Sequence, residues 1–361
     1  MAVKKIGVIT AGGDCPGLNA VIRSVVKRGI VDYNIEAIGF LDGYRGLVEN
    51  KSIDLTYDRV SGILNAGGTI LGSSNRDNPF NFYYDNKQEE PIDVSNLVVE
   101  NYEKNKLDAL VCIGGDGTLT MAHMFAKKGL NVIGVPKTID NDVQGTDQTF
   151  GFDTAVYTAT SAIDQIRTTA ASHHRVLVVE LMGRTAGWLA LFSGIASGSD
   201  VILIPEIPFN IDSICNFVTD RSTRGKRYSI IACAEGAKPA GGDSIVIENK
   251  DKRTGMVRLG GVGNYVAQEI EDKTEISSRT TVLGHLQRGG SPTPSDRILA
   301  SRYGSKAMEL VMDGVFDVTV CLKGNKIENF PLDKVANNPR LVSRDSEFLQ
   351  IARSVNVSLG E

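Results

Sequence analysis

The sequence has little net charge, few cysteines and no long apolar run, and each of these absences excludes a class of protein. Lys and Arg number 39 against 43 Asp and Glu, which gives a formal net charge of -4. So balanced a charge excludes a whole-molecule attraction to nucleic acid or to an anionic membrane, and any basic site must be local. The apolar stretch near the N-terminus is about five residues long, far below what a signal peptide or a membrane span needs. We therefore expect a soluble, cytoplasmic protein with no nucleic-acid or membrane partner.

Cysteine usage points to the same compartment. The five cysteines are scattered along the chain, and no two of them form a CxxC pair. At least Cys112 and Cys233 lie inside apolar runs that are typical of buried strands. This pattern argues against a disulfide framework and favours a reducing compartment.

Short β-branched runs alternate with helical patterns along most of the chain. The runs "ALVCIGG", "NVIGVP" and "RVLVVELM" are apolar on both faces, which is typical of parallel strands covered by helices. A chain of 361 residues with 42% hydrophobic content can bury two cores. We predict an α/β protein with two doubly wound, mostly parallel sheets. The expected parts are a first domain over residues 1–150 and roughly 287–320, a second over 151–286, and a C-terminal extension over 321–361. We expect the helix that begins near Pro294 to pack on the first domain.

The glycine-rich turns lack the two commonest phosphate-binding signatures, GxxxxGK(S/T) and GxGxxG. The P-loop and ordinary dinucleotide-binding hypotheses therefore lose their main support. The first predicted strand ends in "TAGGDCPGLNA", and a later one ends in "GGDGTLT". Such turns let backbone approach phosphate oxygens at the carboxyl ends of strands, although a single Gly-Gly pair can equally be a tight turn. Asp116 would repel bound phosphates unless a divalent cation intervened, which makes it the best metal candidate. Thr118 could alternatively cap the next helix.

A second group of polar residues stands in "VPKTIDNDVQGT". If the chain stays extended, Thr138, Asp140 and Asp142 share one face at a spacing of about 6.6 Å, with Lys137 beside them. Basic side chains gather at strand ends in "SHHRVLVVELMGRTAG" and "SSRTTVLGHLQRGGSP". The planar guanidinium fork suits phosphate, so these arginines are phosphate-binding candidates.

Together these motifs resemble the phosphofructokinase family. The resemblance rests on "GGDCPGLNAVIR", "GGDGT", "PKTIDND", "FGFDTA", "MGRTAGWLA", "AEG" and "LGHLQRGGSPTPSDR", spread over residues 12–297. It implies a two-domain fold with the active site in the cleft between the domains, the first binding the phosphoryl donor and the second the sugar phosphate. It also implies Mg²⁺-dependent phosphoryl transfer to the 1-hydroxyl of fructose 6-phosphate, a step of glycolysis.

The resemblance also implies residue roles. Asp140 matches the general base and Arg184 the arginine that stabilises the transferring group, while Thr138 and Asp142 match supporting residues. The matched donor-binding residues are Gly13, Arg76, Asp116, Gly117 and Thr118. The matched sugar-phosphate residues are Thr138, Asp140, Met182, Gly183, Arg184, Glu235, His285 and Arg288. Arg175 and Arg279 match arginines that reach the sugar phosphate from a neighbouring subunit, which implies a homodimer or homotetramer with shared active sites.

The identity of the donor depends on two residues. In the family that the chain resembles, glycine at the position of Gly117 leaves room for a nucleotide, whereas pyrophosphate-dependent members generally have aspartate there. Lysine at the position of Lys137 is typical of pyrophosphate users. An aspartate would exclude the α-phosphate and ribose, while a flexible lysine can stay beside a nucleotide, so we favour ATP over pyrophosphate.

Two rival hypotheses remain open. Other kinases that share "GGDGT" explain that motif, but they leave "PKTIDND" and "GHLQRGG" as coincidences. A non-catalytic regulatory subunit or sensor of the same fold would have lost the base or the arginine. Because Asp140, Asp142 and Arg184 are all present, we favour an enzyme.

Overall fold

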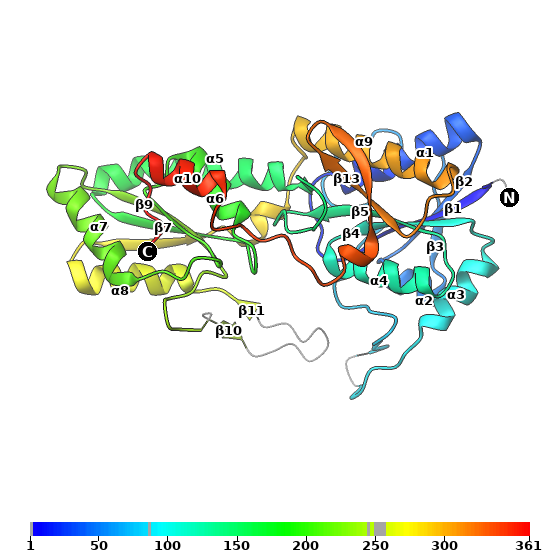
Figure 1. The fold of residues 1–361 in the computed structure, drawn as a ribbon, viewed down its shortest axis with the longest axis horizontal. Helices are drawn as coiled ribbons and strands as arrows, with labels where there is room; N and C mark the ends of the chain where they lie inside the picture. The colour runs from blue at the N-terminus through cyan, green and yellow to red at the C-terminus, as the bar shows by residue number, and fades with distance from the viewer. Residues whose placement is uncertain (1–2, 86–87, 244–245, 249–257) are drawn as a thin grey trace. The chain divides into compact units, whose positions relative to one another are not determined.

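The structure is a computed structural model that describes residues 3–85, 88–243, 246–248 and 258–361. It divides the chain into two compact units (Figure 1). Unit 1 consists of Met1–Ile139, Val143–Thr154 and Arg288–Pro339. Unit 2 consists of Asp140–Asp142, Ala155–Gln287 and Arg340–Glu361.

The described part of unit 1 holds an eight-stranded sheet in the order β14-β13-β5-β4-β1-β2-β3, with β6 beside β5. The strands are β1 (Lys5–Thr10), β2 (Glu36–Phe40), β3 (Ser52–Asp54), β4 (Ala109–Gly114), β5 (Val132–Thr138), β6 (Phe150–Gly151), β13 (Val318–Lys323) and β14 (Lys326–Pro331). Only β3 and β14, at the two edges, pair in the antiparallel sense. Every residue of β4 is buried, as expected of a central parallel strand.

Helices cover both faces of this sheet. They are α1 (Leu18–Tyr33), α2 (Tyr44–Glu49), α3 (Ser95–Lys104), α4 (Asp116–Lys127) and α9 (Pro294–Met312). Helices α1 and α9 lie on one face, and α2, α3 and α4 on the other (Figure 1). The predicted packing of the helix from Pro294 on the first domain is confirmed, because α9 packs along α1. A side chain at Gly304 of α9 would lie 2.7 Å from the carbonyl oxygen of Val21, so glycine is what allows these helices to approach.

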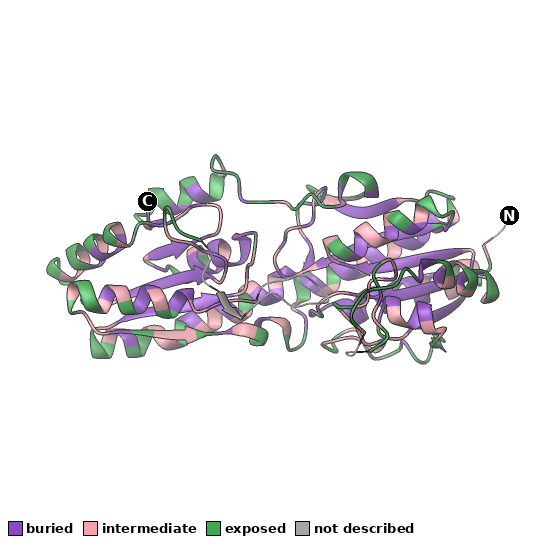
Figure 2. Cartoon of the chain, turned by 90° about the horizontal axis from the view of Figure 1, so that it is seen from below, coloured by how far each residue is buried: buried purple, intermediate pink, exposed green. Residues whose placement is uncertain are grey.

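Unit 2 contains a parallel sheet in the order β12-β7-β9-β8. Its strands are β7 (Val176–Leu181), β8 (Val201–Leu203), β9 (Ser229–Ala234) and β12 (Ser278–Val282). Helices α7 (Ile211–Thr223) and α8 (Val262–Thr274) cover one face, and α5 (Phe152–His173), α6 (Trp188–Ser197) and α10 (Glu347–Ser354) cover the other (Figure 1). A short antiparallel pair, β10 (Val246–Glu248) and β11 (Arg258–Leu259), lies outside the sheet. Figure 2 shows buried strands and helices with exposed outer faces in each unit. The predicted fold class, with mostly parallel sheets between helices, is therefore confirmed.

The predicted C-terminal extension over residues 321–361 is wrong as a separate part. Strand β13 pairs with β5 and brings β14 into the sheet of unit 1. From Arg340 onward the chain joins unit 2, where α10 packs on α6 through Phe348, whose ring lies 4.6 Å from that of Phe192. The segment is shared between the units because its apolar residues are buried in two different cores.

The motifs "FGFDTA" and "SPTPSDR" meet in unit 1 at the start of α9. The backbone N-H and the hydroxyl of Thr154 donate to Asp296 at 2.8 and 2.6 Å, and the Thr293 hydroxyl donates to Asp153 at 2.5 Å. Asp296 is fully buried, and this burial raises the pKa of its carboxyl to about 6. These two motifs therefore serve packing.

All five cysteines are buried free thiols, including Cys112 in β4 and Cys233 in β9. Burial raises the pKa of the Cys112 thiol to about 12, so it stays protonated and unreactive. No helix in the described part of the chain combines the length and the apolar character that a membrane span requires.

Candidate functional site

The first cluster of predicted site residues lies in unit 1, where β1, β4 and β5 end side by side. The turn after β1 needs glycine at Gly12, whose φ of 83° is left-handed. The loop that carries Arg76 is tied to this turn, because the Gly12 N-H donates to Ser74 at 2.9 Å and the Ser73 hydroxyl donates to Gly12 at 2.5 Å. Arg76 itself is exposed, two residues beyond Ser74.

Lys137 reaches this turn from the end of β5. Its side chain is 5% exposed, and its Nζ donates to the carbonyl oxygen of Gly13. A Cβ on Gly12 would lie 3.5 Å from both Lys137 Nζ and Thr118 Oγ1. The structure thus brings together Gly13, Thr118 and Lys137, three residues that the sequence predicted for the site of the phosphoryl donor.

Arg288 also lies at the first glycine turn. A Cβ on Gly13 would lie 2.8 Å from its Nη1 atom. Arg288 therefore belongs to unit 1, whereas its predicted phosphate-binding companion, His285, belongs to unit 2. A cationic guanidinium and a cationic ammonium thus flank one glycine turn, which is an arrangement that suits a phosphate oxygen.

The start of α4 forms the other side of this cluster. Gly115 is the N-cap residue, so the prediction that Thr118 could cap the helix is wrong. Thr118 is instead the third helical residue and is buried, and its carbonyl oxygen accepts the hydroxyl of Tyr44 at 2.9 Å. A side chain on Gly114 would clash with Thr118, which explains glycine at that position.

Gly117 differs from its neighbours because the fold does not require it. A Cβ there would meet no atom within 4 Å, and its φ is not left-handed. The residue is exposed in the first turn of α4. Glycine in a helix costs about 1 kcal/mol relative to alanine, so its presence here has no explanation within the chain.

Asp116 stands at the N-terminus of α4, half-buried beside the glycine turns. The described residues contain no group of three or more His, Cys, Asp or Glu side chains that could hold a metal. Mg²⁺ is commonly bound by one or two carboxylates together with substrate phosphates. A single carboxylate next to a predicted phosphate-binding turn therefore fits a cation that would arrive with the phosphates.

The expectation that Thr138, Asp140 and Asp142 share one face is wrong. Strand β5 ends at Thr138, the chain bends at the next two residues, and Asn141 adopts a left-handed φ of 53°. This break ends the alternation of an extended strand, and Thr138 falls in unit 1 while Asp140 and Asp142 fall in unit 2. In unit 2 the carbonyl oxygen of Asp142 accepts the N-H of Arg340 at 2.8 Å.

The second cluster lies in unit 2 at the carboxyl ends of β7 and β9. Met182, Gly183 and Arg184 follow β7, and Glu235 follows β9. The two segments are joined, because the Glu235 N-H donates to Leu181 at 2.8 Å and the Gly236 N-H donates to Gly183 at 3.2 Å. The predicted sugar-binding residues of these two motifs therefore stand side by side. His285 lies in a single turn of 3-10 helix (Gly284–Arg288) after β12, where its side chain is exposed.

Sequence reasoning missed Gly236. A side chain there would clash with the backbone carbonyl oxygen of Arg184. Glycine at this position is therefore what allows the arginine segment to lie against the end of β9. The only signal in the sequence was the glycine in "AEG", which by itself cannot be told from a turn glycine.

Arg175 and Arg279 lie at the opposite end of the unit 2 sheet. Arg175 directly precedes β7, and Arg279 pairs with Leu177 near the start of β12. The six residues of β7, about 20 Å at 3.3 Å per residue, separate them from Arg184. Arg279 donates to the carboxylate of Glu271 at 3.2 Å. Within one chain, these two arginines are thus far from the other predicted sugar-phosphate residues of unit 2.

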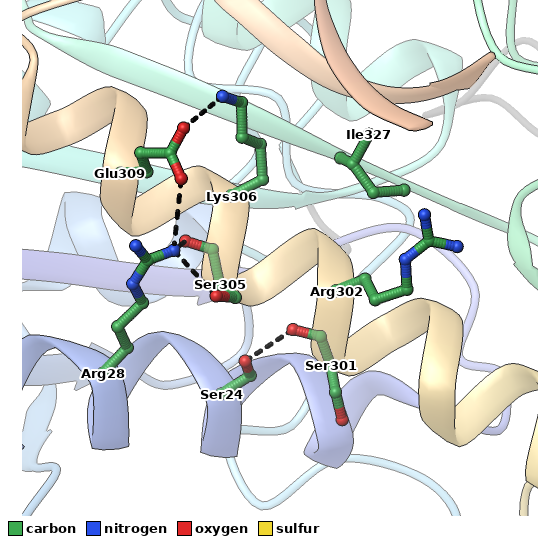
Figure 3. Close-up of a pocket in the computed structure, with 8 residues that line it drawn as sticks. All are labelled: Ser24, Arg28, Ser301, Arg302, Ser305, Lys306, Glu309 and Ile327. Carbon is green, nitrogen blue, oxygen red and sulfur yellow. Dashed lines mark hydrogen bonds and ion pairs between the residues drawn. The ribbon is translucent and has the colours of Figure 1, made fainter. Parts of the chain in front are cut away.

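A cavity of about 590 Å³ in unit 1 contains none of the predicted site residues. It is lined by Ser24, Arg28, Ser301, Arg302, Ser305, Lys306, Glu309 and Ile327 (Figure 3). Its cations are engaged within the chain, because Arg28 lies 3.5 Å from Glu309 and 3.4 Å from Asp32, and Lys306 also pairs with Glu309. Arg302 lies apart from this cluster and donates to the carbonyl oxygen of Asn325 at 2.6 Å (Figure 3). We assign no ligand to this cavity.

Comparison with known proteins places these residues in context. A family model described as phosphofructokinase matches residues 5–311. The ATP-dependent 6-phosphofructokinase 2 of Clostridium perfringens (strain 13 / Type A) is 49% identical over 99% of this chain and 99% of its own. The pyrophosphate–fructose 6-phosphate 1-phosphotransferase of Streptomyces coelicolor is also 49% identical, over 91% of this chain and 93% of its own.

A solved structure is similar as well. Phosphofructokinase from Saccharomyces cerevisiae matches with a TM-score of 0.79 and 31% identity, over 92% of this chain and 45% of that one. This chain therefore spans about half the length of the yeast chain. The similarity extends through both units, so it covers both clusters of predicted site residues.

Proposed function

The chain belongs to the phosphofructokinase family, and we propose that it is a 6-phosphofructokinase that uses ATP. The reaction transfers the γ-phosphoryl group of ATP to the 1-hydroxyl of D-fructose 6-phosphate, giving fructose 1,6-bisphosphate and ADP in glycolysis. The observation that carries the proposal is the 49% identity to an ATP-dependent 6-phosphofructokinase over nearly the whole of both chains.

Asp140 is the general base of the proposed reaction. Its carboxylate takes the proton of the 1-hydroxyl as that oxygen attacks the γ-phosphorus, and the bond to the bridging oxygen of ADP breaks. Positioned proton transfer of this kind is worth about 10² to 10⁴ in rate. Asp140 follows the end of β5 by two residues, and ligands of open parallel sheets bind beyond the carboxyl ends of the strands, which supports this role.

Electrostatic stabilisation supplies the rest of the proposed rate enhancement. Arg184 donates to the oxygens of the transferring phosphoryl group, where negative charge redistributes in the transition state. Thr138 and Asp142 orient the groups around the reacting centre.

The donor site is the cluster in unit 1. The backbone around Gly13 and Gly117, the side chain of Thr118 and the cations of Lys137 and Arg76 bind the phosphates. Asp116 would hold Mg²⁺, which when bound neutralises charge on the donor phosphates. The half-buried position of Asp116 beside these turns supports this assignment.

Pyrophosphate is the second candidate donor. Lys137 lies at the proposed donor turn, and the Streptomyces relative named for pyrophosphate has the same 49% identity as the one named for ATP, over 91% rather than 99% of this chain. Gly117 favours ATP, because the open space at this residue leaves room for the rest of the nucleotide.

The sugar phosphate is bound by the residues that the motifs predict for it. Met182, Gly183 and Glu235 contact the sugar, and His285 and Arg288 bind its 6-phosphate. Arg175 and Arg279 complete this site in a neighbouring copy of the chain. Their location at the far end of the unit 2 sheet supports such an exchange between subunits, and thus a homodimer or homotetramer. The five free thiols support a cytoplasmic location.

Initial rates test this function most directly. We would assay wild type and Asp140→Ala with fructose 6-phosphate and Mg²⁺, with ATP and pyrophosphate in parallel. We expect ATP-dependent activity that falls by about 10² to 10⁴ in the variant, at an unchanged melting temperature. Activity with pyrophosphate alone would select the second donor. If neither donor supported any activity, the chain would be a sensor or regulatory subunit instead.

A further inference from the structure

Arg340 holds the turn that carries Asp140. Its backbone N-H donates to the carbonyl oxygen of Asp142 at 2.8 Å, and its Nη1 donates to the carbonyl oxygen of Asn141 at 3.2 Å. Both bonds lie within unit 2 and join residues almost 200 positions apart. The turn Asp140–Asp142 is a three-residue piece of unit 2 between two stretches of unit 1, so its attachment depends on such long-range contacts.

Arg340 is itself fixed by Trp188, the first residue of α6. The guanidinium carbon lies 4.2 Å from the centre of the indole ring, and the indole N-H donates to the Arg340 carbonyl oxygen at 2.9 Å. Trp188 is only 6% exposed. A stacked arginine over a buried tryptophan is a well-defined arrangement, because the cation and the ring attract each other and the indole cannot rotate away.

A second link reinforces the first. Glu206 accepts the N-H of Val342 at 2.9 Å and the N-H of Gly187 at 3.0 Å. Gly187 lies three residues after Arg184, in the motif "MGRTAGWLA". Residues 340–342 are therefore hydrogen-bonded to the turn that carries the proposed base. Through Trp188 and the carboxylate of Glu206, they are also linked to the segment that follows Arg184.

We infer that Arg340 is a positioning residue for catalysis, which sets the orientation of Asp140 through the backbone of the turn. This inference rests on the proposed role of Asp140. Arg340 does not act on substrate. It fixes the two carbonyl oxygens that follow Asp140 relative to the start of α6, so that the carboxylate and Arg184 keep a constant geometry within unit 2.

The test compares three variants of the full chain. Arg340→Met keeps an unbranched apolar stem but removes the guanidinium, and with it the charge and the bond to Asn141, while the backbone bond to Asp142 remains. Arg340→Lys restores a cation. Arg344→Met is the matched control, because Arg344 is exposed on the same segment. We expect kcat of Arg340→Met to fall about 10- to 100-fold, because a displacement of about 1 Å can cost 10²-fold. KM for fructose 6-phosphate and ATP should change less than about threefold, Arg340→Lys should recover part of the loss, and Arg344→Met should match wild type.

A double-mutant cycle separates positioning from simple destabilisation. In the Asp140→Ala background, Arg340→Met should lower kcat less than about threefold, because no base remains to be positioned. An equal loss of kcat in both backgrounds would overturn the inference, as would unchanged kcat in Arg340→Met.

Hydrogen exchange tests, without any assay of activity, whether Arg340 anchors the turn Asp140–Asp142. Backbone amides of residues 139–146 should exchange at least about tenfold faster in Arg340→Met than in wild type or Arg344→Met. Unchanged exchange would overturn the inference. If wild type were inactive with both donors while exchange increased as expected, the proposed function would fail and the anchoring of the turn by Arg340 would stand.

Discussion

Gly117 allows the choice of phosphoryl donor to be tested apart from the stability of the fold, by the substitution Gly117→Asp. A Cβ at this position meets no atom within 4 Å and the backbone is not left-handed, so the aspartate fits the chain without displacement. Replacing glycine by aspartate in a helix contributes about 0.3 kcal/mol, and an acidic residue in the first turn adds about 0.3 to 1 kcal/mol. The free energy of unfolding should therefore rise or stay constant.

The effect on ATP should have the opposite sign. A carboxylate about 4 Å from a phosphate charge is repelled by about 1 kcal/mol in water and about 4 kcal/mol at an effective dielectric constant of 20. Because Gly117 is exposed, the real value lies between these limits. At 1.4 kcal/mol per tenfold, KM for ATP should rise between about fivefold and about a thousandfold. Pyrophosphate lacks the α-phosphate and ribose, so its KM should change far less.

The assay measures KM and kcat for both donors in wild type, Gly117→Asp and the neutral control Gly117→Ala, together with urea unfolding. We expect Gly117→Ala to retain most ATP activity, because it adds little bulk and no charge. An unchanged KM for ATP in Gly117→Asp would refute the reasoning. Equal losses with ATP and pyrophosphate would refute it too, since the charge would then act on phosphates that both donors share.

Two further substitutions test features that the sequence did not reveal. In Asp296→Asn the pH dependence of stability should change. Burial, with a smaller contribution from neighbouring Asp153, raises the pKa of the folded carboxyl to about 6, so the native state binds the proton more tightly than the unfolded chain. The wild type should therefore lose about 3 kcal/mol relative to the variant between about pH 4 and about pH 6, and a difference in urea unfolding energy that does not vary with pH would contradict this. Gly236→Ala should lower kcat about 10- to 100-fold by displacing the backbone of Arg184. Gly225→Ala meets no atom but is strained by the left-handed φ of 89°, so it should lower stability without lowering kcat, and equal rates in the two variants would exclude the clash.

The parallel strands could be predicted from the sequence because their signal is local. Buried parallel strands must be apolar on both faces, and the runs that became β4 and β7 have that composition. The meeting of the two glycine turns could also be anticipated, because glycines after neighbouring parallel strands come to the same edge of a sheet. Lys137 was expected beside the donor from the resemblance to the phosphofructokinase family, and it does reach the turn at Gly13.

The features that could not be predicted depend on contacts between distant segments. The extension over residues 321–361 was expected to stand apart, because nothing in its own composition shows that β13 pairs with β5. Arg340 lies outside both the motifs and the matched family model, and its importance is visible only once it is found beside Asn141. The geometry around Asp140 was mispredicted because alternation assumes a continuous strand, whereas Asn is one of the few residues that readily adopts the left-handed φ which ends it.

The glycines show why even a specific motif leaves part of its meaning undetermined. Within "GGDGT", Gly114 is required by Thr118, since any side chain would clash there, while Gly117 faces open space and costs the helix stability. In "AEG", Gly236 makes room for the backbone of Arg184. A sequence records all three as the same letter. The space around each glycine distinguishes them: Gly114 and Gly236 have no room for a Cβ, whereas Gly117 does. Because the fold does not require glycine at Gly117, a bound ligand is the remaining physical reason for the absence of a side chain there.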